Sequence, residues 1–157
     1  MFLKGRGVSP RFFILVCFSL VLLMLDYKHY LYIYDQNHCL SGCIELLEPY
    51  FFHVYTHSIN KTPVMEKIEY QQNGFTICES WFKDYSTGID CSMQEGFTIQ
   101  DSWFILTLNR ETKNLMLAVS PIPGHAIKIK EKLYPLVLFA FTNSIITLTT
   151  NFSLHTP

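Results

Sequence analysis

The sequence predicts an α+β, membrane-anchored architecture, in which one N-terminal transmembrane helix is followed by a small antiparallel β-rich domain. Three observations predict it. An apolar run follows a basic N-terminus, a segment rich in aromatic and β-branched residues occurs twice, and turn-forming residues separate the short apolar segments around it. The length of 157 residues fits one domain.

The composition narrows the class of protein. Hydrophobic residues make up 49% of the chain and charged residues only 16%, whereas charged residues are about 25% of an ordinary soluble domain. This excludes a disordered chain, which has few aromatics and many charges. The net charge of −1 argues against nucleic acid as a partner, because a general nucleic-acid binder needs a basic face.

The first predicted element is a signal-anchor helix over residues 12–34. Residues 12–25 are apolar except for Ser19, and a basic tail, residues 1–11, precedes them. A membrane span needs about 20 apolar residues, so the tyrosine-rich residues 27–34 must extend the run. No small-residue cleavage site follows it, which favours a retained anchor over a cleaved signal peptide. We therefore expect a single-pass membrane protein with its N-terminus in the cytoplasm.

This region also resembles a known family. Its opening residues include Arg6, Gly7, Ser9, Arg11, Ser19, Leu23 and Asp26. Through these residues it is similar to the N-terminus of the bacterial rod-shape-determining family MreC. The resemblance implies a cell-shape scaffold. It is confined to the first 30 residues, and the chain departs from the family afterwards: no coiled-coil heptads follow residue 50, and the chain is too short for both a coiled coil and a β-rich region.

An internal repeat identifies the β-rich domain, which we place at residues 66–132. Residues 72–82 and 94–104 are identical at eight of eleven positions. Alternation with a period of two predicts one strand per copy. In the first copy it places Phe75, Ile77, Glu79 and Trp81 on one face, opposite Thr76, Cys78, Ser80 and Phe82. Residues 35–65 are interpreted as a connector, and residues 133–157 as an apolar tail, for which a second span and a buried strand pair are alternatives.

The candidate binding residues are the aromatic pairs that end the two copies, namely Trp81 with Phe82 and Trp103 with Phe104. Exposed aromatic side chains supply much of the contact energy at protein interfaces. A protein partner is therefore the expected ligand of this surface. Core packing of the same four rings is the alternative reading.

The cysteines allow two interpretations. On the exported side of a membrane, Cys78 and Cys91 form the preferred disulfide, which stabilises by about 3 kcal/mol in the chain-entropy model. Free, reduced cysteines in a cytosolic chain are the alternative. Cys39 and Cys43, with His53 and His57, carry ligand types suited to zinc. The nine residues between Cys43 and His53 fall short of the about 12 found in the usual finger, so we predict no metal.

The sequence thus predicts a small, membrane-anchored, non-enzymatic interaction protein. The seven glycines are scattered singly, so no phosphate-binding loop is present, and no cofactor or small-molecule substrate is expected. An MreC-like cell-shape scaffold and a Cys/His metal-binding module remain alternatives. A short reading frame without a defined function is a further alternative, against which the repeat argues.

Overall fold

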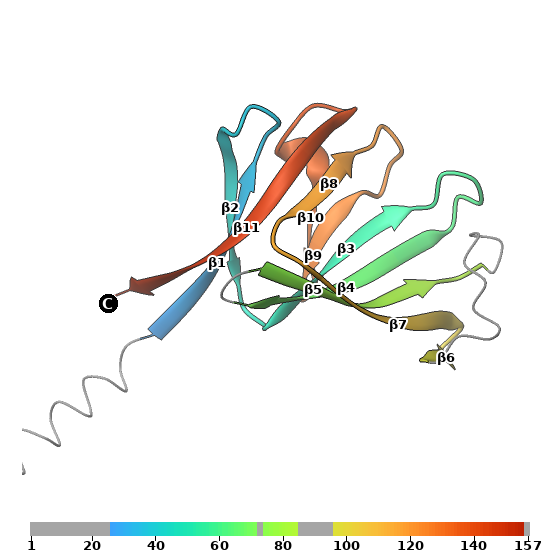
Figure 1. The fold of residues 1–157 in the computed structure, drawn as a ribbon. Coiled ribbons are helices and arrows are strands. Elements are labelled where there is room, and N and C mark those ends of the chain that lie inside the picture. Colours follow the sequence, from blue (N-terminus) through green and yellow to red (C-terminus); the bar gives the residue numbers. More distant parts are fainter. Residues whose placement is uncertain (1–25, 72–73, 85–95, 156–157) are drawn as a thin grey trace, which may run out of the picture.

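The computed structural model describes residues 26–71, 74–84 and 96–155, with side chains from residue 28 to residue 150 of these ranges. Within them the chain forms two antiparallel sheets (Figure 1). Sheet A has the strand order β2-β1-β11-β8. Its strands are β1 (Asp26–Tyr34), β2 (Leu40–Leu46), β8 (Leu115–Val119) and β11 (Ser144–His155).

Sheet B is the larger sheet, with the order β10-β9-β3-β4-β5-β7-β6. Its strands are β3 (Tyr50–Thr56), β4 (Pro63–Gln71), β5 (Gly74–Phe82), β6 (Phe97–Gln100), β7 (Trp103–Thr112), β9 (Ala126–Ile129) and β10 (Lys132–Pro135). A single 3-10 turn in the described part of the chain, η2 (Leu136–Leu138), precedes β11. The chain changes sheets several times. Lys113 and Asn114 alone separate β7 in sheet B from β8 in sheet A.

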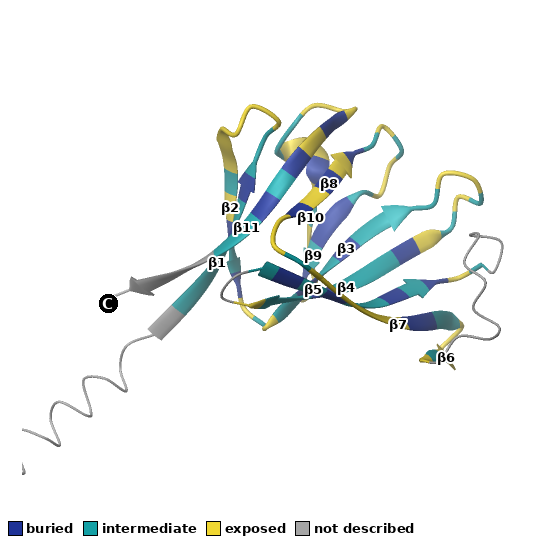
Figure 2. Ribbon diagram, in the orientation of Figure 1, coloured by how far each residue is buried: buried dark blue, intermediate teal, exposed yellow. Residues whose placement is uncertain are grey.

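The hydrophobic core lies between the two sheets. One cluster of buried side chains combines Leu31 and Ile33 of β1 with Phe51 of β3, Ile68 of β4 and Ile127 of β9, all of them 0% exposed. Figure 2 shows the buried positions alternating with exposed ones along the strands. Each such side chain stabilises the fold by about 1.5–3 kcal/mol relative to exposure. The molecule is therefore a β-sandwich, and sheet B extends beyond the area that sheet A covers (Figure 1).

The predicted helix over residues 12–34 is wrong, and with it the α+β class. Residues 26–34 form β1, which is hydrogen-bonded between β2 and β11. Leu31 and Ile33 point into the core, while Tyr30, Tyr32 and Tyr34, which alternate with them, are half-buried. This alternation is the period of a strand, and the aromatic residues read as an interfacial belt belong to a sheet. Residues 12–25 lie outside the described residues.

The membrane location is corrected on the same finding. Among the described residues, no helix is long and apolar enough to cross a membrane. The single-pass, signal-anchor prediction depended on one continuous helix over residues 12–34, and the strand from residue 26 onward excludes that helix.

The β-structure also extends beyond residues 66–132. Residues 35–65 contain β2 and β3 and the start of β4, and residues 133–157 contain most of β10, together with η2 and β11. Ile146 and Leu148 of β11 are 0% exposed, so this apolar segment completes the core from sheet A. Two regions interpreted as a connector and a tail thus supply strands on which the sandwich depends.

Candidate functional site

A β-bulge decides which side chains of β5 face outward. β5 pairs with β4 and with β7, and in both ladders the register shifts next to Cys78. The extra residue reverses the alternation, as bulges do. Ile77 therefore faces the core together with Phe82, although an uninterrupted strand would place them on opposite faces; both are buried. Trp81 consequently faces away from sheet A.

Four aromatic side chains lie together on this outer side of sheet B. We call them the aromatic face: Tyr50 and Phe52 of β3, Trp81 of β5 and Trp103 of β7. All four are half-buried. The ring centroids are 5.7 Å apart for Tyr50 and Phe52, 6.2 Å for Phe52 and Trp81, and 6.4 Å for Trp81 and Trp103. The interplanar angles of 83°, 81° and 62° are edge-to-face arrangements, which each contribute about 0.5–1.5 kcal/mol beyond area burial.

Charged neighbours hold these rings in place. The Trp81 Nε1–H donates a hydrogen bond to Glu79 Oε2 at 2.7 Å. The Lys67 ammonium lies 5.1 Å from the Tyr50 ring centroid, and the Lys83 ammonium lies 4.7 Å from that of Trp103. Cation–π contacts of this kind contribute about 0.5–1 kcal/mol at exposed sites. The rings are therefore ordered before any ligand arrives, which lowers the entropy lost on binding.

The surroundings of the aromatic face have the composition of a protein interface. Val54, Met65 and Ile105 occupy neighbouring outward positions in one cross-strand row with Trp81. Protein interfaces are enriched in Trp, Tyr, Phe and Met. Beside Tyr50 and Phe52 lies an open hollow of about 470 Å³, whose other walls are Glu48, Lys128, Lys130 and Glu131. An apolar centre with charged residues around it is thus present on one side of sheet B.

The structure separates the four predicted binding residues into two pairs. Trp81 and Trp103 lie on the aromatic face, as a binding role requires. Phe82 and Phe104 lie on the opposite side of sheet B, where their rings are 5.7 Å apart. Phe82 is 0% exposed and packs with Val64 and Leu106 in a second hydrophobic cluster. The alternative reading, core packing, therefore applies to the phenylalanines and not to the tryptophans.

Tyr50 and Phe52 were not predicted as site residues. They lie in a segment interpreted as a connector, although its sequence alternates in the manner of a strand: Phe51 and His53 are buried, and Tyr50 and Phe52 between them face outward. The aromatic content of residues 50–56 was the signal that could have located β3.

The two copies of the repeat fold differently. The first copy is the single strand β5, whereas the second is a hairpin in which β6 and β7 flank Asp101 and Ser102. These two residues have φ angles of 49° and 65°, as a type I′ turn requires at both central positions. Asp tolerates the left-handed region better than most residues. Where the first copy has Glu79 within a strand, the second therefore turns at Asp101, and this brings Trp103 beside Trp81.

A group of polar side chains lies on the inner side of the same strands. We call it the histidine cluster: His53 and Tyr55 of β3, Glu66 of β4, and His125, which immediately precedes β9. His53 Nδ1 lies 3.1 Å from Glu66 Oε2. The His125 ring centroid is 6.5 Å from that of His53 and 5.8 Å from that of Tyr55. His53 Nε2 and both ring nitrogens of His125 are buried, with no partner at hydrogen-bonding distance and angle in the described residues.

This environment shifts two pKa values. Burial, followed by the charge of Glu66, raises the pKa of Tyr55 to about 12, and Arg110 opposes the shift. Burial and then His53 lower the pKa of His125 below its usual range, and the nearby Thr56 backbone opposes the shift. Both shifts follow from removing ionisable groups from water.

The predicted cysteine and metal sites are not assembled within the described residues. Cys39 and Cys43 are both exposed; Cys43 is in β2 of sheet A, and Cys39 immediately precedes that strand. His53 belongs to β3 in sheet B. No group of three or more potential metal-binding side chains is found in the described part of the chain. Cys78 is half-buried and makes no disulfide with a described residue. Its predicted partner Cys91 lies outside the described residues, so that disulfide stays a prediction.

A second apolar surface lies at the end of η2 and just after it, but its side chains make fewer contacts than those of the aromatic face. Leu138 is 68% exposed and Phe141 is 91% exposed. The Phe141 ring makes no ring contact in the described residues, whereas every ring of the aromatic face contacts another ring or a cation. The aromatic face is therefore the better prepared binding surface.

Comparison with known proteins places these features in a family. No curated protein and no solved structure matches the chain. One family model matches residues 51–136, more than half of the chain. The match runs from the second residue of β3 to the first residue of η2, so it contains the histidine cluster and every residue of the aromatic face except Tyr50. The MreC resemblance lies outside it. The chain belongs to the family described as a domain of unknown function, DUF1850.

Proposed function

We propose that this chain is a non-enzymatic binding domain that holds a protein partner on the aromatic face of sheet B. The observation that carries the proposal is the contact between Trp81 and Trp103, whose ring centroids lie 6.4 Å apart on a side of sheet B that faces away from sheet A. The other described elements are sheet A and η2, and both contribute to the core on the inner side.

The physical preparation of the rings supports a binding role. Aromatic side chains dominate the energetics of protein interfaces when they are central and surrounded by residues that exclude water. Glu79 fixes the Trp81 indole through a hydrogen bond, and Lys83 lies against the Trp103 ring. Glu79 is occupied by this contact, and its matching acid in the repeat, Asp101, lies in the exposed β6–β7 turn. This arrangement supports recognition by the aromatic face rather than acid–base chemistry on it.

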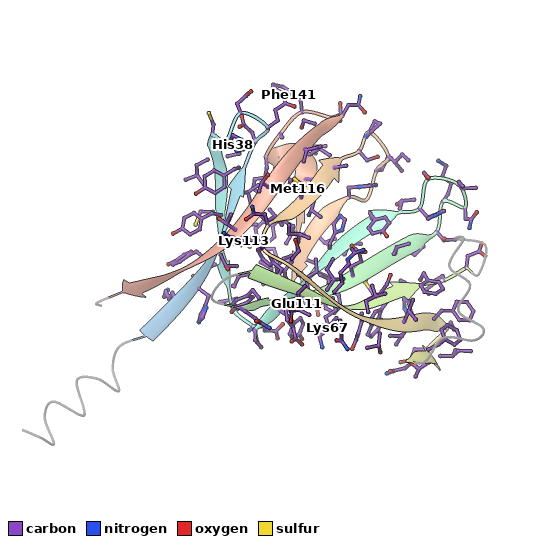
Figure 3. All side chains as sticks on the ribbon, in the orientation of Figure 1. His38, Lys67, Glu111, Lys113, Met116 and Phe141 are labelled. Atoms are coloured by element: carbon purple, nitrogen blue, oxygen red, sulfur yellow. The ribbon has the colours of Figure 1, made fainter. Side chains whose placement is uncertain are left out.

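The test compares the proteins that the full-length chain captures from its source cells when one face at a time is altered. Three versions are used: the unaltered chain, Trp103→Ala on the aromatic face, and Met116→Ala. Met116 is the matched control, since it is 68% exposed on sheet A. Figure 3 labels Met116, together with Lys67 from the aromatic side of sheet B.

The proposal predicts at least one protein that the unaltered chain and Met116→Ala capture equally. Trp103→Ala should capture the same protein at least about tenfold less, because loss of an interface anchor costs about 2 kcal/mol or more. If no captured protein shows this pattern while all three versions remain folded, the proposal is wrong.

A further inference from the structure

Buried imidazole nitrogens without a well-aligned hydrogen-bond partner are unusual, and three of them lie together in the described part of the chain. They are Nε2 of His53 and both ring nitrogens of His125. Nearly all buried polar groups in folded proteins have hydrogen-bond partners. Leaving one without a partner costs about 1–3 kcal/mol. The histidine cluster is therefore a part of the core that favours an uncharged His125.

The ionisable groups around His125 come from three strands. His53 and Tyr55 are on β3 and contact the His125 ring, and Glu66 is on β4 and contacts His53. Arg110 is on β7 and influences Tyr55. Ser80 of β5, which pairs with Glu66, carries no charge. The one carboxylate in the group already contacts His53 Nδ1. A proton on His125 would therefore place a positive charge beside another imidazole, while the carboxylate of the histidine cluster already contacts His53.

The strand that follows His125, β9, is short and lies between β3 and β10. β9 pairs with β3 through only three residue pairs, and the β3 residues in them are Phe52, His53 and Val54. Phe52 and Val54 point to the outer side, on either side of the buried His53. Phe52 contacts Trp81 with their ring centroids 6.2 Å apart. The ladder next to His125 thus holds one end of the aromatic face.

We propose that the histidine cluster is a pH-sensitive switch for the aromatic face, in which proton uptake by His125 loosens the β9–β3 pairing and displaces Phe52 from Trp81. The inference rests on the proposed function, because it describes control of the same surface. A charged imidazole that cannot be solvated in place relaxes by moving toward water, and the short β9 ladder is the element that can yield. Acid therefore alters the aromatic face before the sandwich unfolds.

The chain contains its own reporter. Both of its tryptophans, Trp81 and Trp103, belong to the aromatic face, so fluorescence excited at the long-wavelength edge, where tyrosine absorbs little, reports this surface. The experiment records the emission maximum and acrylamide quenching of the full-length chain from pH 8 to pH 5, with far-UV circular dichroism in parallel. The variants are His125→Gln and His38→Asn. The second is the matched control, because His38 is an exposed turn residue with a φ of 59°, which Asn also tolerates.

The switch predicts that the unaltered chain and His38→Asn show a fluorescence transition below about pH 6.5, the usual histidine pKa, with circular dichroism unchanged. His125→Gln loses this transition. A flat response in the unaltered chain, an identical transition in His125→Gln, or a transition that coincides with unfolding overturns the switch.

If His125→Gln does not fold, the variant His53→Gln tests the switch instead. Because His53 lowers the pKa of His125, His53→Gln moves the midpoint toward higher pH, and an unchanged midpoint overturns the switch. The fluorescence measurements require no bound protein partner. A failed switch with the capture pattern intact leaves the proposed function standing, whereas a failed capture pattern overturns the proposed function itself.

Discussion

Glu79 and Trp81 lie two residues apart on β5, and the Trp81 Nε1–H donates to Glu79 Oε2 at 2.7 Å. Both side chains face outward because the bulge at Cys78 shifts the alternation of the strand. The hydrogen bond orients an indole that also contacts Phe52 and Trp103. One carboxylate therefore helps to order three rings of the aromatic face.

Removing this carboxylate should loosen the aromatic face. We expect Glu79→Ala to lower the free energy of unfolding by about 1–2 kcal/mol, because hydrogen bonds to charged groups contribute about 1.5–3 kcal/mol and this one is only half-buried. Urea unfolding measures the change. Glu111→Ala, an exposed position on β7, is the control and should lie within about 0.5 kcal/mol of the unaltered chain. Equal losses in the two variants would contradict the role given to Glu79.

The two phenylalanines that follow the tryptophans should behave as core residues. Phe82 is 0% exposed, so we expect Phe82→Ala to lower the free energy of unfolding by about 3–5 kcal/mol. Trp103→Ala should cost clearly less, because Trp103 is half-buried on the outer side. Urea unfolding of both variants gives the comparison. A larger loss for Trp103→Ala than for Phe82→Ala would show that the sides of sheet B are assigned wrongly.

Acid should destabilise the fold through His125. In the unfolded chain this imidazole takes up a proton near pH 6.5, whereas in the fold its pKa is lowered, chiefly by burial. The unfolded state therefore binds more protons as the pH falls below about 6.5, and stability falls with it. Thermal unfolding at pH 7.5 and pH 5.5 measures the loss. In His125→Gln the loss should be smaller, and an unchanged pH dependence would exclude His125 as its source.

Alkali should reveal the second shifted group. The pKa of Tyr55 is raised to about 12, first by burial and then by Glu66. An unfolded tyrosine ionises near pH 10, so the stability contributed by the neutral phenol decreases as the pH rises above about 10. Absorbance at the phenolate band, recorded for the unaltered chain and for Tyr55→Phe, isolates this group by difference. A difference signal with a midpoint near 10 would contradict the buried position of Tyr55.

Part of this architecture could be predicted from local sequence. The aromatic and β-branched content of residues 72–82 indicated a strand, and β5 spans Gly74–Phe82. The same period of two is present in residues 26–34, where Leu31 and Ile33 alternate with tyrosines. There the apolar run before them favoured a helix. The strand is instead formed by pairing of β1 with β11, which lies more than 100 residues away in the chain, so no local pattern contains this contact.

The candidate site was predictable only in part, for two physical reasons. A bulge moves every following side chain to the other face, and nothing in the residues around Cys78 marks its position. The second copy of the repeat turns at Asp101 and Ser102, so two similar sequences form different structures. Trp81 and Trp103 could be selected by residue type, whereas the opposite placement of Phe82 required the register of sheet B.

Site-specific photo-crosslinking in the source cells tests most directly whether a partner binds the aromatic face. A photoreactive amino acid replaces either Lys128, in the hollow beside Phe52, or Met116 on sheet A. Binding through the aromatic face predicts a covalent adduct with a protein partner from position 128, no such adduct from position 116, and loss of the adduct when Trp103→Ala is added. An adduct formed equally at both positions, or one that persists with Trp103→Ala, would contradict binding through the aromatic face.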